Sequence, residues 1–341
     1  ATVGIIVKNE AAHVGEALDH VLASEFPADQ FEVVVVDGHS TDGTARIVTA
    51  AAQRDSRIRL IPEPWPRGTH GMARNLVADN ARGLYLAFTD GDCLVDRTWL
   101  STLVARLDSE RALDPSVVGA GGPRTPAATT SWRESLINTA LGTFLGSGGS
   151  HGFVTTSALY TDSIPNYNAV YVTAIVRQER YSRLGVGDDY EFNTRLGQRG
   201  YKLAFEPRAV VRHHQEGSFR ALVRQSFRYG EAQVRVFALR RKMRRFAPLA
   251  GLFTTGVLVG PLFVLMSRPL FATFLAVMGL YGSLALLTAV RNALRQHSWL
   301  GLLTALLYPA LHFSYGWGVL HGAFAASAGR LSIGAAETGS L

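Results

Sequence analysis

Two aspartates separated by a single glycine, Asp90 and Asp92, follow a run of apolar residues in this chain of 341 residues. Carboxylates spaced in this way at the end of a strand can converge on one hard cation, because Mg²⁺ and Mn²⁺ take oxygen ligands. Such an ion also bridges phosphate oxygens and neutralises the charge on a departing diphosphate. The pattern therefore predicts a site for Mn²⁺ or Mg²⁺ beside a phosphorylated substrate. The alternative is a solvated turn that binds nothing.

The elements around this pair alternate between strands and helices. Short apolar, β-branched runs are typical of buried strands, and apolar residues at helical spacing lie between them. The predicted strands cover residues 3–7, 31–36, 58–61 and 84–89, and the predicted helices cover residues 10–24, 44–52 and 72–80. This alternation predicts an α/β domain with a largely parallel sheet. Ligands of such sheets lie outside the carboxyl ends of the strands, where Asp37 and Asp90 both fall.

The C-terminal third of the chain is more apolar than an ordinary core requires. The chain is 47% hydrophobic and only 18% charged, whereas soluble domains average about 25% charged residues. Three stretches without charged side chains, at 248–266, 270–290 and 299–326, each approach or exceed the roughly 20 residues that span a bilayer. They predict about three transmembrane helices; the alternative is the buried helical core of a soluble domain. Ahead of them, residues 218–246 predict one basic, amphipathic helix at the membrane interface.

These patterns divide the chain into four parts. The predicted parts are a catalytic domain at 1–217, the interfacial helix at 218–246, transmembrane helices within 247–326 and a tail at 327–341.

Basic residues around the apolar stretches predict the orientation in the membrane. A cluster at 240–245 precedes the first stretch, and Arg291 and Arg295 follow the second. Only Arg268 lies in the intervening loop, and only Arg330 lies in the tail. By the positive-inside rule, we expect the catalytic domain in the cytoplasm and the C-terminus outside.

The overall charge and the cysteine content narrow the class of partner. The net charge is +7, and many basic residues lie between Arg208 and Arg245, next to the apolar region. This placement favours an anionic membrane surface and phosphates over nucleic acid, for which no motif is present. The single cysteine, Cys93, excludes an intramolecular disulfide and argues against a cysteine-based zinc site.

Four motifs in a fixed order give the chain a family resemblance. They are VGIIVKNE at 3–10, VVVVDGHSTDGT at 33–44, GMARN at 71–75 and DGD at 90–92. Their order and spacing resemble the start of the family-2 glycosyltransferases of the GT-A fold, although many relatives have a proline-containing segment where this chain has Val7 and Lys8. The resemblance implies a Rossmann-like, nucleotide-sugar-binding α/β domain.

The resemblance also implies roles for single residues. Glu10 and Asp37 would bind the nucleoside of the donor, with Asp37 facing the base. Arg74 would lie beside the nucleotide. Asp90 would lie near the ribose or the metal, and Asp92 would be the direct metal ligand. Outside the family pattern, Asp37 can be a turn residue and Arg74 a surface residue of a helix.

A second acidic pair, Asp188 and Asp189, begins a predicted helix that runs to Arg199. It resembles the family's acidic pair, whose second carboxylate is the general base in inverting members. This implies that Asp189 takes a proton from the acceptor hydroxyl, with Asp188 beside the acceptor. A carboxylate near a helix N-terminus stays ionised, which suits a base. The alternative is that both residues only cap the helix.

A third motif lies on the basic helix. Gln225, Arg228 and Tyr229 are similar to the Gln-x-x-Arg-Trp motif of membrane-bound members, with tyrosine in place of tryptophan. At positions i, i+3 and i+4 the three share one helix face. The resemblance implies that Arg228 binds the donor diphosphate, which a guanidinium group suits, and that Gln225 and Tyr229 contact the acceptor sugar. The alternative is a helix that only rests on anionic lipid.

A histidine is the remaining metal candidate. His213 and His214 lie between the last predicted strand and the basic helix. In some GT-A enzymes a histidine from this region completes the metal shell, which makes His213 a candidate ligand. A pair of surface histidines is the alternative.

Together the motifs predict an inverting glycosyltransferase. It would move a sugar from a UDP- or GDP-sugar to a lipid-linked acceptor, such as a polyprenyl phosphate glycan, at the cytoplasmic face. The segment at 218–230 with apolar stretches behind it looks most like the succinoglycan-biosynthesis glucosyltransferase subgroup. Alternatives are a processive polysaccharide synthase, for which three spans are too few unless an oligomer forms the channel, a non-catalytic nucleotide-sugar-binding protein, and a transporter.

Overall fold

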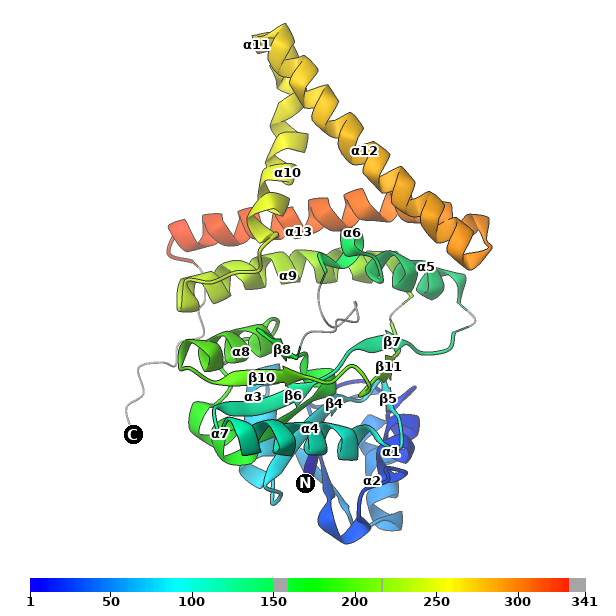
Figure 1. The fold of residues 1–341 in the computed structure, drawn as a ribbon, viewed down its shortest axis with the longest axis vertical. Helices are drawn as coiled ribbons and strands as arrows, with labels where there is room; N and C mark the ends of the chain where they lie inside the picture. Colours follow the sequence, from blue (N-terminus) through cyan, green and yellow to red (C-terminus); the bar gives the residue numbers. More distant parts are fainter. Residues whose placement is uncertain (130, 150–158, 216, 331–341) are drawn as a thin grey trace. The chain divides into compact units, whose positions relative to one another are not determined.

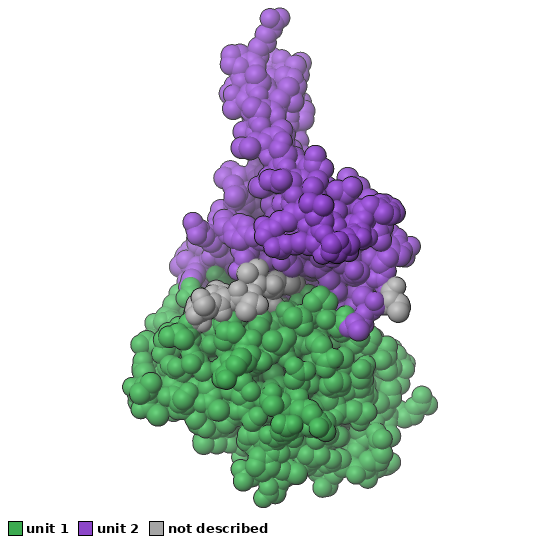
Figure 2. Space-filling view, turned by 45° about the vertical axis from the view of Figure 1, so that its right-hand side comes forward, with its two compact units in different colours: residues 1–127, 155–214, 334–341 green, residues 128–154, 215–333 purple. Residues whose placement is uncertain are grey.

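The computed structural model describes residues 1–129, 131–149, 159–215 and 217–330. The described residues form two compact units, shown in green and purple in Figure 2. The first takes its described residues from 1–127 and 155–214, and the second takes them from 128–154 and 215–333. Most of the predicted tail at 327–341 lies outside the described residues.

The first unit is built on an eight-stranded mixed sheet (Figure 1). In spatial order its strands are β3 (Ile58–Pro62), β2 (Glu32–Asp37), β1 (Thr2–Val7), β4 (Tyr85–Asp90), β9 (Ala169–Val172), β6 (Val117–Gly121), β10 (Lys202–Phe205) and β8 (Tyr160–Thr161). The four strands from β3 to β4 are mutually parallel, as predicted. The sheet is largely parallel but mixed, because β9 runs antiparallel to both β4 and β6, while β6 and β10 keep the direction of β4. The short edge strand β8 is likewise antiparallel to β10.

Helices cover both faces of this sheet. One apolar cluster joins the strands to α1 (Val14–Leu22), α2 (Thr44–Arg54) and α4 (Trp99–Leu113). A second cluster joins them to α3 (His70–Asn80), α7 (Thr173–Glu179) and α8 (Asp188–Gln198). In β2, Val33 and Val35 enter the first cluster while Val34 and Val36 enter the second. Continuous burial on both sides explains why this strand reads as an unbroken run of valines.

A second, three-stranded sheet lies in the same unit and has no counterpart among the predicted elements. Its order is β5 (Cys93–Val95), β11 (Val211–His213) and β7 (Arg124–Pro126). β11 pairs antiparallel with β5, in a register that sets His213 opposite Cys93. A histidine distant in sequence is thereby brought next to the Asp90–Asp92 turn.

The second unit is helical. It contains α5 (Trp132–Leu141), α6 (Phe144–Ser147), α9 (Phe219–Arg240), α10 (Ala247–Val259), α11 (Phe263–Met266), α12 (Arg268–Gln296) and α13 (Thr304–Ser327), with 3₁₀ turns η3 (Gly260–Leu262) and η4 (Trp299–Leu303). α9 confirms the predicted long basic helix. It begins at a capping residue, Ser218, whose side chain accepts a hydrogen bond from the amide of Ala221, as expected for an N-cap. α9 and α13 lie side by side within this unit (Figure 1).

Two helical segments are long and apolar enough to cross a membrane. They are Ala247–Met266, which combines α10, η3 and α11, and Arg268–Gln296, which is α12. Only 17% and 6% of their most apolar windows are buried in the structure, unlike a helix in a soluble core. The third predicted stretch forms η4 and α13 and is not among the described segments that meet this criterion. The structure therefore supports two of the three predicted transmembrane helices.

Candidate active site

The predicted metal-binding aspartates lie where β4 ends. Asp90 is the last residue of β4, and Asp92 immediately precedes β5. Gly91, between them, is buried against Val7 and Glu10, and a Cβ atom there would lie 2.8 Å from Cγ1 of Val7. The middle residue of the motif is therefore a glycine because the turn packs directly on the end of β1.

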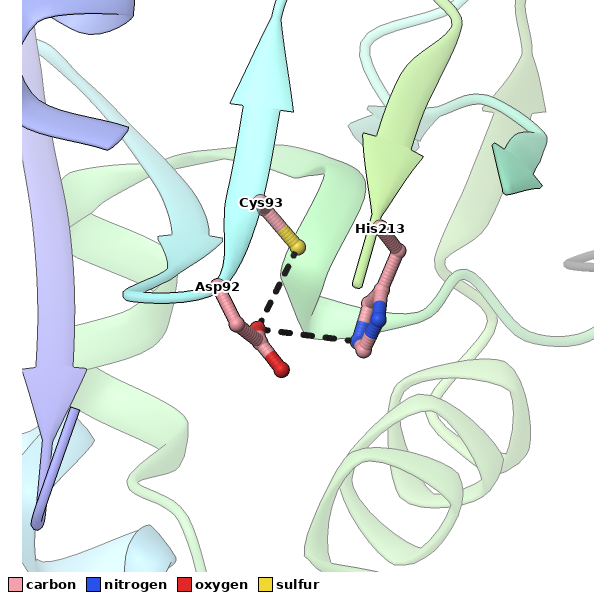
Figure 3. A group of neighbouring side chains, drawn as sticks. All are labelled: Asp92, Cys93 and His213. Carbon is pink, nitrogen blue, oxygen red and sulfur yellow. Dashed lines mark hydrogen bonds and ion pairs between the residues drawn. The ribbon is translucent and has the colours of Figure 1, made fainter. Parts of the chain in front are cut away.

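Three side chains with ligand atoms converge beside this turn. Asp92, Cys93 and His213 each offer one ligand atom, and these atoms lie within 4.8 Å of one another (Figure 3). The distance from Nε2 of His213 to Oδ1 of Asp92 is 3.7 Å, and that from Sγ of Cys93 to the same oxygen is also 3.7 Å. The pairing of β5 with β11 holds the imidazole in place. The structure thus brings the candidate ligand His213 to Asp92, and its role toward a metal stays a prediction.

The histidine is arranged as a neutral ligand. Nδ1 of His213 is hydrogen-bonded to the carbonyl oxygen of His214, so Nδ1 carries the proton and Nε2 presents a lone pair toward Asp92. Burial, with a contribution from the charge of Arg124, lowers the pKa of His213 to about 4. The ring is therefore uncharged at neutral pH, as a metal ligand must be.

The cysteine is a poor ligand for a hard cation in this setting. Burial, with further contributions from the Asp92 and Asp90 charges, raises the pKa of the Cys93 thiol well above its usual value. A protonated thiol does not bind Mn²⁺ or Mg²⁺, because the thiolate is the ligand form. Cys93 is instead a hydrogen-bond donor to Asp92, and the carboxylate and the imidazole are the candidate ligands of this group.

Acidic side chains crowd the same space. Burial, followed by the charges of Asp92 and Asp90, raises the pKa of Glu10 to about 7. Burial also raises the pKa of both aspartates, and for Asp90 the Asp92 charge adds to this while Arg74 opposes it. Three carboxylates that disfavour one another's ionisation lose this penalty when a divalent cation binds among them. The donor set therefore fits a hard divalent ion.

The second acidic pair is connected to this cluster through Arg74. The guanidinium of Arg74 donates a hydrogen bond to Oδ2 of Asp188, and both side chains are buried. The charges of Asp188, Asp90 and Asp189 all act on Arg74, so one cation lies among the three carboxylates. Burial raises the pKa of Asp188 to about 6, although Arg74 opposes this shift. The predicted nucleotide contact Arg74 is therefore held inside the protein as the partner of Asp188.

Asp189 stands next to this buried pair and remains half-exposed. It occupies the first turn of α8, and its Oδ1 accepts a hydrogen bond from the amide of Tyr190 at 2.7 Å. The geometry thus offers an accessible carboxylate at the helix start, which is what a general base requires.

The predicted base-binding residue lies at the neighbouring strand end. Asp37 closes β2 and is only 6% exposed. Its Oδ2 accepts a hydrogen bond from the amide of Ser40 at 3.2 Å. Among the described residues, Oδ1 of Asp37 has no hydrogen-bond partner. A buried acceptor in this state is costly unless a ligand supplies the donor.

The third motif lies on α9, in the second unit. Gln225, Arg228 and Tyr229 are all exposed. Nε2 of Gln225 donates a hydrogen bond to the Tyr229 hydroxyl at 3.4 Å, which agrees with their predicted common face. Their roles toward the diphosphate and the acceptor stay predictions.

Some residues of the site were missed by sequence reasoning. His70 begins α3, and the charges of both Asp90 and Asp189 act on it, while desolvation and Arg74 lower its pKa. Glu63 follows β3, and the charge of Asp37 acts on its carboxyl group. Glu63 could have been found from the sequence, because it stands at the end of a predicted strand of the same sheet. His70 could not, since no pattern in the sequence distinguishes it from other helix residues.

Comparison with known proteins identifies relatives of the chain. The family model described as glycosyl transferase family 2 matches residues 2–165. Glycosyltransferase AglE of Haloferax volcanii is 29% identical over 269 residues, which cover 75% of this chain and 81% of the relative. Succinoglycan biosynthesis protein ExoA of Rhizobium meliloti is 25% identical, with coverage of 71% and 72%. A Methanococcus voltae enzyme, dolichyl N-acetyl-alpha-D-glucosaminyl phosphate 3-beta-D-2,3-diacetamido-2,3-dideoxy-beta-D-glucuronosyltransferase, is 20% identical, with coverage of 66% and 70%.

A solved structure shares the fold. Mannosyltransferase PcManGT from Pyrobaculum calidifontis, in complex with GDP-Man and Mn²⁺, superposes with a TM-score of 0.57 at 21% identity. The match covers 95% of this chain and 86% of that chain. It supports the GT-A assignment of the α/β unit.

Proposed function

The chain is a member of glycosyl transferase family 2 through its residues 2–165, and from this premise we propose that it is a metal-dependent, inverting glycosyltransferase of a lipid-linked glycan. The donor is a nucleotide sugar, UDP- or GDP-linked. The acceptor is carried by a lipid such as a polyprenyl phosphate at the cytoplasmic membrane face.

One observation carries this proposal. The Asp90–Asp92 turn, His213 and the buried Arg74–Asp188 pair come from separate segments and meet at the carboxyl end of the sheet. A turn that only bound solvent would need neither the neutral imidazole nor the crowding of Glu10 against the aspartates. The arrangement instead resembles a site prepared for a cation and an anionic ligand.

Asp92 and His213 would hold the ion, with Asp90 and Glu10 around it. Mn²⁺ or Mg²⁺ bound there would supply positive charge for the leaving diphosphate. Asp37 would bind the base of the donor through its unpaired buried oxygen. Arg228 would contribute a second positive charge to the diphosphate.

Asp189 would act as the base. Its carboxylate takes the proton of the acceptor hydroxyl as that oxygen forms a bond to the anomeric carbon of the donor. The bond from the anomeric carbon to the diphosphate oxygen breaks, and its electron pair leaves with the nucleoside diphosphate. Arg74 and Asp188 fix the start of α8, so they would position Asp189 rather than contact the sugar.

The helical unit supports a lipid-linked acceptor. Only 17% and 6% of the most apolar parts of its two segments are buried. The name of the Methanococcus voltae relative includes dolichyl N-acetyl-alpha-D-glucosaminyl phosphate, a lipid-linked sugar. An enzyme held at the membrane meets such an acceptor in two dimensions.

A two-span arrangement would give a different topology from the expected one. Three spans would place the C-terminus outside, whereas two spans return it to the side of the catalytic domain. The position of α13 alongside α9 supports the second arrangement, because a basic, amphipathic helix is typical of an interface.

A screen of nucleotide sugars tests the function. The full-length protein, purified in detergent, is incubated with UDP- and GDP-sugars, with and without Mn²⁺ or Mg²⁺, and nucleotide release is measured. We expect release from one donor class only when the metal is present, and Asp92→Asn to abolish it. Metal-independent release, or none with any donor in the presence of membrane lipid extract, would contradict the proposal.

A further inference from the structure

A pair of buried acids lies at the ends of β2 and β3. Asp37 is 6% exposed and Glu63, the residue after β3, is 8% exposed. The amide of Glu63 donates to the carbonyl oxygen of Asp37 at 3.0 Å, which places the two residues side by side at the sheet edge. The charge of Asp37 acts on the Glu63 carboxyl, and burial is the main reason that the pKa of Glu63 is raised.

Both carboxylates have acceptor atoms that a ligand can use. Oδ1 of Asp37 is buried and has no partner among the described residues, which costs free energy that a structural role does not recover. The Glu63 carboxylate lies beside it and is not among the buried groups without a partner, so its oxygens are accessible to a ligand. A ligand that brings N–H donors to this place would recover the cost at Asp37.

The loop after β3 is shaped around the Glu63 carboxylate. Gly68 packs against it so closely that a Cβ atom at this position would overlap Oε2 of Glu63. Nε2 of His39 is hydrogen-bonded to the carbonyl oxygen of Trp65 at 2.8 Å, which ties the same loop to the segment after β2. The two loops therefore hold the acids at one place on the edge.

The hydrogen-bonding edges of the nucleobases distinguish what fits two acceptors. Guanine presents two adjacent donors, N1–H and the N2 amino group. Uracil presents a single N–H between two carbonyl oxygens, which a carboxylate repels. Cytosine and adenine each set a ring-nitrogen acceptor beside their amino group. Lys8, whose charge also acts on Glu63, adds a cation suited to the O6 and N7 acceptors of guanine.

We propose that Asp37 and Glu63 select guanine, so that the donor is a GDP-sugar rather than a UDP-sugar. This rests on the proposed function, because it names the base bound at the same donor site. Asp37 and Glu63 would be specificity-determining residues that accept hydrogen bonds from N1–H and the N2 amino group.

Isothermal titration of the full-length protein in detergent with GDP and with UDP, each with Mn²⁺, tests the proposal. A well-placed set of base contacts discriminates by about 1–3 kcal/mol, or roughly 5- to 150-fold. We therefore expect GDP to bind at least about tenfold more tightly than UDP. Glu63→Gln should reduce this ratio by about tenfold, since a neutral amide oxygen is a weaker acceptor than a carboxylate and the other end of the amide is a donor.

The ratio of the two affinities is an internal control for the fraction of active protein. Glu25→Gln is the matched variant, because Glu25 is an exposed acid of the same unit, and it should leave the ratio unchanged. Equal or tighter binding of UDP by the wild-type protein would overturn the base assignment alone, provided that UDP-sugar transfer is seen. Failure to bind either nucleotide would overturn both this inference and the proposed function.

Discussion

Replacing Arg74 by methionine should strongly destabilise the first unit. The side chains of Arg74 and Asp188 are only 8% and 5% exposed, so the substitution leaves a buried carboxylate without its cation. Breaking a buried pair in this way costs about 3–5 kcal/mol. In a unit of this size about 1 kcal/mol corresponds to a shift of ~2–4 °C in melting temperature. We therefore expect the unfolding transition to fall by roughly 6–20 °C at pH 8.

The loss of stability in the Arg74→Met variant should depend on pH. The folded pKa of Asp188, about 6, lies above the usual value of 3.8. The folded protein thus binds a proton that the unfolded chain releases, and stability falls as the pH rises from about 4 through 6. Without Arg74 the pKa of Asp188 rises further. The deficit of the variant should then be largest at pH 8 and smaller at pH 5, where Asp188 is protonated.

An exposed ion pair supplies the control. Arg180 pairs with Asp79 in the same unit, but these side chains are 43% and 47% exposed. Arg180→Met should cost at most about 1 kcal/mol. The double variant Arg74→Met with Asp188→Asn should recover much of the loss, since no buried charge remains unpaired. Melting of Arg74→Met within a degree or two of Arg180→Met at pH 8 would refute the reasoning.

Three further predictions concern the metal and the membrane. In titration calorimetry, Asp92→Asn should weaken Mn²⁺ binding at least tenfold. Cys93→Ser should change the Mn²⁺ affinity less than about threefold, because the thiol is not a ligand. A larger effect of Cys93→Ser than of Asp92→Asn would contradict the ligand assignment. Mn²⁺ affinity should rise between pH 6 and 8 with release of protons, because burial and the neighbouring acids raise the pKa of Glu10 to about 7, and Glu10→Gln should flatten this rise. A reporter fused to the C-terminus should lie in the cytoplasm and one inserted at Arg268 should lie outside; opposite sides for the C-terminus and the catalytic domain would restore the three-span arrangement.

The parts of the fold set by local patterns could be predicted from the sequence. Strand β2 and helix α9 were visible as an apolar run and as an amphipathic, basic helix. The bounds of β2 agree within one residue, whereas α9 ends at Arg240, six residues before the predicted end. Asp37 and Asp90 were located because the carboxyl ends of parallel strands share one edge. These inferences need only the period of the sequence and the direction of the strands.

The parts set by long-range pairing could not be predicted in this way. β5 and β11 have three residues each, too few to show a period, and their pairing alone separates His213 from an ordinary surface histidine. The reversed strand β9 looks like any other apolar segment until its neighbours are known. Arg74 reads as a surface residue of a helix, and its burial follows from contact with α8 rather than from its own surroundings in sequence.

The third apolar stretch differs from the other two in its polar contacts. Residues 299–326 lack formal charges, yet the histidines on α13 find partners inside the helical unit. Nε2 of His312 is hydrogen-bonded to the carbonyl oxygen of Leu145 at 2.8 Å, and Nδ1 of His321 lies 2.8 Å from Oε1 of Glu231 on α9. Polar contacts of this kind suit a helix packed along another helix.

The central claim is that the half-exposed carboxylate of Asp189 is the base of a metal-dependent sugar transfer. The most direct test is the transfer rate of Asp189→Asn, measured with a saturating nucleotide sugar and Mn²⁺. The affinity of the variant for the nucleotide is measured in the same preparation. A base of this kind contributes about 10²–10⁴-fold. We expect the rate to fall at least about 100-fold while the dissociation constant of the nucleotide changes less than about threefold. Turnover near that of the wild-type protein would contradict the account.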